Sequence, residues 1–66
     1  MILKDIRNKA NLTQLELSQR CGCERSTIAK IETGAVYPSV KLAKRIGEVL
    51  NFDWTLLYED KKHKGA

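Results

Sequence analysis

Few residues in this chain have the types and spacing that catalysis or metal binding requires. The 66 residues include one histidine, His63, and two cysteines, Cys21 and Cys23, which stand too close together for a comfortable disulfide. Together these three residues cannot complete a four-ligand zinc site. The sequence contains no glycine-rich phosphate loop, no nucleophile elbow and no His-Glu-x-x-His motif. We therefore expect no enzyme, no bound metal or cofactor and no small-molecule substrate.

One short stretch, residues 24–33, has side chains suited to a different kind of chemistry. At about 100° per residue in a helix, Ile28 and Ile31 fall on one side. The opposite side carries small and basic residues: Arg25, Ser26, Ala29, Lys30 and Thr33. Arginine and lysine beside small residues can enter a groove of double-stranded DNA and donate hydrogen bonds to base edges or phosphates. The stretch is a candidate nucleic-acid contact; the alternative is an ordinary solvated helix face.

The composition limits both the size and the partners of the protein. The chain has room for one small domain, over residues 1–60, followed by a basic tail over residues 61–66 that we expect to be disordered. Twelve Lys and Arg against eight Asp and Glu give a net charge of +4, which favours an anionic partner such as a nucleic acid. No apolar run approaches the roughly 18 residues of a membrane span or resembles a signal peptide, so we expect a cytoplasmic protein without membrane contact.

Hydrophobic spacing predicts three helices in the first half of the chain, over residues 2–11, about 14–20 and about 24–32. Thr13 and Glu16 have the spacing of a capping box, which places the start of the second helix. Residues that readily adopt a left-handed backbone should end the three helices: Asn11, Gly22 and Gly34.

Two further helices complete an all-α fold. Ser39 can cap a fourth helix, whose apolar side chains cover about 120° of its circumference. Asn51 closes this helix, and Asp53 can cap a short fifth helix over residues 54–60. Strand signals are weak, because the sequence has no alternating run and no Asn-Gly turn. We expect a compact domain of five helices.

The segment TQLELSQRCGCERSTIAKIETG, residues 13–34, resembles the helix-turn-helix of phage repressor and Cro proteins, the XRE family. Members of that family read roughly LTQxELAxxxGVSxSTISxxExG. The segment PSVKLAKRIGEVLNFDW is similar to the family's closing PSLxxLxKIAxxLGVSxD, so the resemblance covers about residues 2–58. It implies a lambda-repressor-like DNA-binding domain in which the second and third helices form the helix-turn-helix.

The resemblance also implies roles for individual residues. The positions that reach base edges in the family are occupied here by Arg25, Ser26, Ala29 and Lys30. Thr27 lies near the border of that surface. Gln14 matches the glutamine that contacts the DNA backbone and braces the recognition helix, and Thr33 matches a phosphate-contacting corner. An ion pair that joins the first and third helices and orients the domain on the backbone is matched by Arg7 and Glu32.

The chain departs from the family pattern at several positions. Glu24 replaces the serine or threonine that usually caps the recognition helix, and its carboxylate would repel a phosphate or else accept from a cytosine amino group. Gly47 replaces a better helix former at a cost near 1 kcal/mol. The loop AVYP carries no basic residue, so backbone contacts there would use main-chain amides, Tyr37 or Lys41.

Four residues near the end of the chain offer more apolar surface than a short helix can bury against so small a core: Phe52, Trp54, Leu56 and Tyr58. We expect some of them at a dimer interface; the alternative is that Phe52 and Trp54 close the core. Leu15, beside the basic face, is either an incidental exposed residue or a contact for a thymine methyl group.

These features predict a sequence-specific regulator of bacterial or phage transcription that binds double-stranded DNA. We expect a repressor that reads an inverted-repeat operator in the major groove as a homodimer. The alternative is a protein-interaction module, such as an antitoxin or co-regulator, that binds another protein through its fifth helix.

Overall fold

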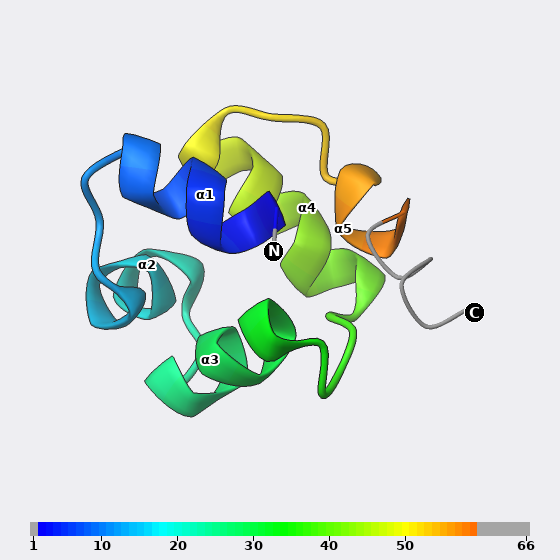
Figure 1. Ribbon diagram of the computed structural model, residues 1–66, viewed down its shortest axis with the longest axis horizontal. Helices are drawn as coiled ribbons and strands as arrows, with labels where there is room; N and C mark the ends of the chain where they lie inside the picture. The colour runs from blue at the N-terminus through cyan, green and yellow to red at the C-terminus, as the bar shows by residue number, and fades with distance from the viewer. Residues whose placement is uncertain (1, 60–66) are drawn as a thin grey trace.

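The computed structural model describes residues 2–59, which form five α-helices: α1 (Ile2–Lys9), α2 (Gln14–Cys21), α3 (Arg25–Thr33), α4 (Val40–Leu50) and α5 (Leu56–Glu59) (Figure 1). The described residues contain no strand, so the predicted all-α fold of five helices is confirmed. The expected basic tail lies outside the described residues. None of the five helices combines the length and the apolar character that crossing a membrane requires.

Two helices, α2 and α4, begin at their predicted caps. The Thr13 hydroxyl accepts a hydrogen bond from the Glu16 amide at 3.0 Å, and the Glu16 carboxylate accepts one from the Thr13 amide at 2.8 Å. This confirms the capping box of α2. The Ser39 hydroxyl accepts from the Leu42 amide at 3.1 Å and caps α4. Glu24 occupies the cap position of α3 without a capping hydrogen bond, as expected for this residue type.

The first four helices each end at a residue in the left-handed conformation. The φ angles are 61°, 74°, 85° and 58° at Asn11, Gly22, Gly34 and Asn51. After each of these residues, the next amide donates to a carbonyl five residues earlier, for example Cys23 to Ser18 at 3.0 Å. This is the Schellman arrangement, which satisfies carbonyls at the helix end. All four predicted helix stops are therefore confirmed.

The fifth helix begins two residues later than predicted, at Leu56. The Asp53 carboxylate accepts hydrogen bonds from the amide and the hydroxyl of Thr55, at 3.0 and 2.7 Å, and these bonds lower the pKa of Asp53. The amides of residues 56–58 each donate to a carbonyl three residues earlier, so the turn that leads into α5 is tighter than an α-helical turn. Asp53 therefore forms a tight turn with Thr55 ahead of α5.

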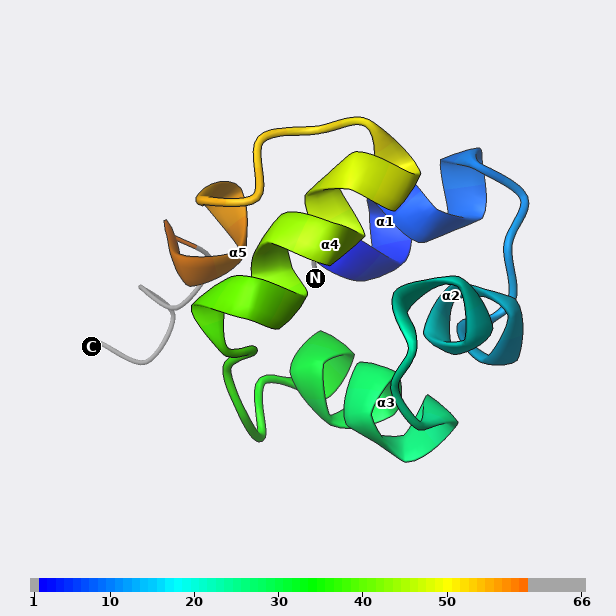
Figure 2. The same cartoon turned by 180° about the vertical axis from the view of Figure 1, so that it is seen from behind.

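The core is built from apolar side chains of all five helices, and its buried members are Leu3, Leu17, Cys21, Ile28, Ile31, Ala43, Ile46, Leu50 and Leu57. In both views of the molecule α3 lies along one edge, with α1 and α4 on its inner side (Figures 1 and 2). No helix of the described part of the chain covers the outer side of α3. The fold thus leaves one long face of α3 open.

Gly47 permits a close approach between α4 and the segment before α5. A Cβ atom at this position would lie 2.8 Å from the Phe52 carbonyl oxygen and 3.0 Å from the Trp54 Cβ. Both distances are shorter than ordinary van der Waals contact. The cost of glycine in a helix is therefore offset here by tight packing of the backbone of residues 52–54 against α4.

Candidate nucleic-acid interface

The outer face of α3 carries the small and basic side chains that helical spacing predicted to lie on one side of the helix. Ile28 and Ile31 are 0% and 4% exposed and anchor the inner face in the core. The exposed residues on the outer face are Arg25, Ser26, Lys30 and Thr33. Ala29 and Thr27 are half-buried on the same helix. The structure therefore brings the predicted base-reading residues together on one accessible helix face.

The turn between α2 and α3 fixes the direction in which α3 points. Gly22 has a φ of 74°, and a Cβ atom there would lie 3.1 Å from the Arg45 guanidinium. That guanidinium, on α4, donates to the Cys21 carbonyl at 3.2 Å and ties the turn to the core. Ser18 is buried on α2, and its hydroxyl donates to the Leu15 carbonyl at 2.7 Å, so its polar group is satisfied within its own helix.

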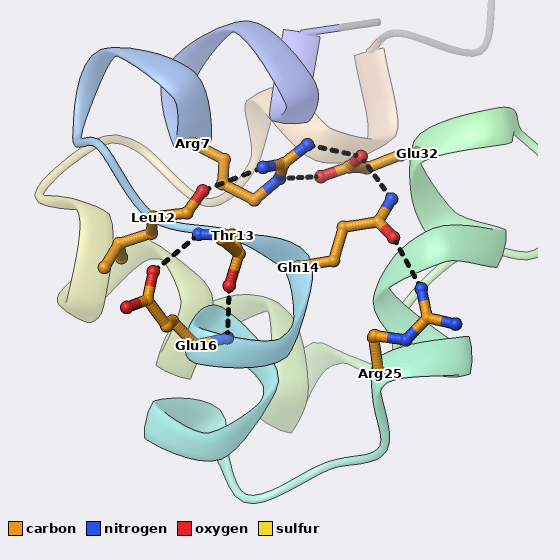
Figure 3. A network of polar contacts seen from close by, with 7 residues as sticks. All are labelled: Arg7, Leu12, Thr13, Gln14, Glu16, Arg25 and Glu32. Atoms are coloured by element: carbon orange, nitrogen blue, oxygen red, sulfur yellow. Dashed lines mark hydrogen bonds and ion pairs between the residues drawn. The ribbon is translucent and has the colours of Figure 1, made fainter.

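A buried ion pair joins α1 to α3 (Figure 3). Arg7 Nε donates to Glu32 Oε2 at 2.6 Å, and Arg7 Nη2 donates to Glu32 Oε1 at 3.2 Å. Arg7 Nη1 donates to the Leu12 carbonyl at 2.8 Å. The hydrogen bonds to Glu32 raise the pKa of Arg7 against the opposing effect of burial. The predicted ion pair is thus formed, and it lies inside the domain, since Arg7 is 8% and Glu32 5% exposed.

Gln14 connects this buried pair to the outer face of α3. Its Nε2 donates to Glu32 Oε1 at 2.9 Å, and its Oε1 accepts from Arg25 Nη1 at 3.2 Å. An ionised carboxylate only accepts hydrogen bonds, so the amide nitrogen of Gln14 must face Glu32 and the oxygen must face Arg25. A continuous chain of hydrogen bonds therefore runs from Arg7 to Arg25 (Figure 3).

The link from Gln14 to Arg25 was not anticipated from the sequence. The family resemblance implied that Gln14 contacts the DNA backbone and braces the recognition helix. The structure shows the two side chains of α3 to which Gln14 bonds, Glu32 and Arg25. Arg25 has five N–H donors in a planar fork, and this bond fixes one end of the fork. The guanidinium is thereby tied to the first residue of α2.

The corner after α3 is formed by Thr33 and the loop that follows. The Thr33 hydroxyl donates to the Lys30 carbonyl at 3.1 Å and lies at the exposed end of the helix. Tyr37 and Lys41, the side chains proposed for backbone contacts in this loop, are both exposed. The loop is attached to α5 by the Tyr58 hydroxyl, which donates to the Pro38 carbonyl at 2.7 Å.

The four residues proposed for a dimer interface are all half-buried, and three of them pack against the core: Phe52, Trp54 and Tyr58. The fourth is Leu56. The rings of Trp54 and Tyr58 meet edge to face, 6.2 Å apart, and Lys44 Nζ lies 5.5 Å from the centre of the Trp54 ring. Among the residues that the structure describes, the large hydrophobic side chains that are exposed lie elsewhere: Leu15, Val36, Tyr37 and Val40. A role for the four residues at a dimer interface stays a prediction.

Both cysteines are free thiols, Cys21 buried and Cys23 half-buried. Burial raises the pKa of Cys21 to about 11 and also raises the pKa of Cys23. Neither thiol is therefore a reactive thiolate at neutral pH. Within residues 2–59 no group of histidine, cysteine and acidic side chains is placed to hold a metal ion, and His63 lies outside that range.

We expect the protein to lose stability as the pH rises from about 9 to about 11. The pKa of Cys21 in the folded state, about 11, lies above its ordinary value of 9.0, so folding favours the protonated thiol. The stabilising effect is complete below pH 9 and is lost as the pH rises through the folded pKa, to a total of about 2 to 3 kcal/mol. Urea denaturation across this range, followed by circular dichroism, measures the loss. Cys21→Ala should reduce the slope of the profile, leaving the smaller contributions of Cys23 and Tyr58, whose pKa values are also raised by burial. An unchanged slope in that variant would contradict the assignment.

Comparison with known proteins finds similarity to helix-turn-helix proteins over most of the chain. The profile of the helix-turn-helix family matches residues 3–57. A Bacillus subtilis protein named as an uncharacterized HTH-type transcriptional regulator, YqaF, is 41% identical over 58 residues, which cover 88% of this chain and 76% of that protein. An HTH-type transcriptional regulator of Archaeoglobus fulgidus is 47% identical over 49 residues, 74% of this chain and 69% of its own length. The ImmF control region 10 kDa protein of Bacillus phage phi105 is 34% identical over 56 residues, 85% of this chain and 62% of that protein. No solved structure matches the chain.

Proposed function

The chain belongs to the helix-turn-helix family of transcription regulators, and from that premise we propose that it is a repressor that binds an inverted-repeat operator as a homodimer. Its family comprises DNA-binding proteins and not enzymes. The observation that carries the proposal is the outer face of α3, on which Arg25 is oriented by Gln14. A helix of this kind fits the major groove, where arginine can bond to a guanine through two acceptors.

The proposed contacts fall into two groups. Base edges are read from α3 by Arg25, Ser26, Ala29 and Lys30. Phosphates are contacted at the sides of this face by Gln14, at the start of α2, and by Thr27 and Thr33 on α3. Arg7 and Glu32 are buried, so their part is to hold α3 at a fixed angle to the rest of the domain. The net charge of +4 supplies attraction to the DNA before the side chains dock.

The proposal of a homodimer follows from the size of the reading element. One nine-residue helix reaches only a few base pairs, so a second copy on a neighbouring half-site is needed to recognise one specific operator sequence. Half-sites about 34 Å apart lie on the same side of the DNA, one helical turn from each other. Binding across a promoter in the cytoplasm is sufficient to repress it. A relative from phage phi105 is named for a control region, which agrees with a regulatory role.

The proposal is tested by selecting bound sequences from a pool of random DNA duplexes. We expect an inverted repeat to be enriched, and the logarithm of its binding constant to fall linearly with the logarithm of the salt concentration. Failure to enrich any sequence would favour the rival function, a protein-interaction module such as an antitoxin or co-regulator. A binding constant that does not change with salt would contradict the proposed phosphate contacts.

A further inference from the structure

The start of α3 has no cap from its own side chains. Glu24 occupies the cap position without a side-chain hydrogen bond, so the first turn of the helix is not fixed locally. At the other end of α3, the buried Glu32 carboxylate bonds to side chains of α1 and α2. Two of the proposed base-reading residues, Arg25 and Ser26, follow Glu24 directly. The direction in which they point therefore depends on contacts from other parts of the domain.

One such contact comes from Arg45 on α4. Its Nη1 donates to the Cys21 carbonyl at 3.2 Å. Cys21 is the last residue of α2, so no later residue of that helix can donate to its carbonyl. The carbonyl also lies at the negative end of the helix dipole, where a positive charge is stabilising. Arg45 thus caps the end of α2 from a different helix, three residues before α3 begins.

The Arg45 side chain also bridges a gap between α4 and the turn that leads into α3. A cavity of about 260 Å³ lies there, and Cys21, Gly22 and Cys23 of the turn line one side of it. The other side is formed by the start of α4 and includes Arg45. Side chains therefore do not fill the space between the turn and α4, and the Arg45 hydrogen bond crosses it.

The helix that carries Arg45 is firmly placed. Two residues close to it on α4, Ala43 and Ile46, are both 0% exposed in the core. Arg45 itself is exposed apart from its contact with the turn, and an exposed arginine can also serve as a phosphate contact. The two roles have different consequences. A phosphate contact strengthens binding to every DNA sequence, whereas a contact that holds α3 in place affects the reading of bases.

From these contacts we infer that Arg45 is a positioning residue, which holds the turn between α2 and α3 so that Arg25 and Ser26 meet base edges in one orientation. The inference rests on the proposed function and deepens it, because it assigns part of the base preference to a side chain of α4. A positive charge at a helix end stabilises by an amount that corresponds to about twofold to fivefold in an equilibrium constant. We expect an effect of this size on operator binding.

The test replaces Arg45 with methionine, which keeps most of the side-chain length but has no charge and no N–H donor. Arg20→Met is the matched control, since Arg20 is exposed on α2 and the substitution removes the same charge. Arg45→Lys keeps the charge, but its nitrogen lies one atom closer to the backbone than Nη1 does. Binding is measured by fluorescence anisotropy on the selected operator and on a scrambled duplex, at several salt concentrations. Thermal melting shows that each variant is folded.

We expect Arg45→Met to bind the operator about twofold to fivefold more weakly than Arg20→Met, and to bind the scrambled duplex equally well. Arg45→Lys should show the same loss relative to the native chain. Both Arg45 variants should relax the preference at the base pair that Arg25→Ala affects, and both should keep the salt dependence of the native chain.

A phosphate contact predicts the opposite pattern. Arg45→Met would then lose affinity equally on both duplexes, its plot of log binding constant against log salt would be less steep by about 0.9, and Arg45→Lys would bind as the native chain does. That pattern would overturn the inference. Binding by Arg45→Met that equals the binding of Arg20→Met on both duplexes would overturn it as well.

A second measurement reports on the turn in the absence of DNA. Burial raises the pKa of both thiols, and the charge of Arg45 acts on the pKa of Cys21 alone, so the reaction rate of Cys23 reports its accessibility. Cys23 should react faster with N-ethylmaleimide in Arg45→Met than in Arg20→Met, as measured by peptide mass spectrometry. An unchanged rate would overturn the inference. A native chain that binds operator and scrambled duplex equally would instead overturn the proposed function, and the rate at Cys23 would still show whether Arg45 holds the turn.

Discussion

Replacing Arg7 with alanine is expected to lower the free energy of unfolding by about 3 to 5 kcal/mol. The substitution leaves the Glu32 carboxylate, 5% exposed, without the two hydrogen bonds and the opposite charge that Arg7 supplies. It also removes the hydrogen bond to the Leu12 carbonyl. A domain of this length has a total stability of about 3 to 10 kcal/mol, so much of the variant should be unfolded at physiological temperature. Urea denaturation followed by far-ultraviolet circular dichroism measures the change.

Two further variants separate the effect of breaking the buried ion pair from the effect of removing one positive charge. Lys9→Ala removes a positive charge from an exposed position of α1 and should change stability by less than about 0.5 kcal/mol. The double variant Arg7→Met with Glu32→Leu removes both buried charges at similar volume, and it should recover most of the lost stability. An Arg7→Ala protein within about 1 kcal/mol of the native chain would show that Glu32 finds other partners or water.

Helix limits could be predicted from the sequence because each depends on a few consecutive residues. Thr13 with Glu16 and the left-handed residues Asn11 and Asn51 act through hydrogen bonds to backbone groups within one helical turn. The start of the last helix was predicted less well, because the Asp53 carboxylate had two possible uses. It could cap a helix that begins at the next residue, or it could form a local turn. It bonds to Thr55, two residues away, in place of capping an α-helix that begins at the next residue.

The outer face of α3 was likewise predictable, since helical periodicity alone places Ile28 and Ile31 opposite Arg25. The hydrogen bond between Gln14 and Arg25 was not, because it joins residues eleven positions apart on two helices. Its formation depends on the crossing of α2 and α3, which the sequence pattern does not specify. The exposed apolar side chains of the segment after α3 were missed for a related reason. A loop has no periodicity, so the exposure of Val36 could be known only from the packing around it.

The second large effect is expected from Arg25→Ala, which should weaken binding to the selected operator by about 1 to 3 kcal/mol. Arginine at this position is proposed to bond to a base edge, so its loss should also relax the preference for one base pair in each half-site. Arg20→Ala is the matched control, because it removes the same charge from an exposed position of α2 outside the face of α3. Titrations on the operator and on a scrambled duplex of the same length distinguish a loss of base preference from a general loss of affinity. An equal loss on both duplexes for Arg25→Ala would reject base reading.

Gln14→Ala tests whether base reading by Arg25 depends on the hydrogen bond between Gln14 and Arg25. If Gln14 only contacted phosphate, Gln14→Ala would weaken binding to every sequence by a similar factor, and its effect would add to that of Arg25→Ala. Because Gln14 orients the Arg25 guanidinium through a 3.2 Å hydrogen bond, we expect Gln14→Ala to relax the preference at the same base pair. The double variant should then lose less specificity than the two single losses combined. Strict additivity would mean that Arg25 adopts its reading position without the brace, and that the buried pair of Arg7 and Glu32 serves folding alone.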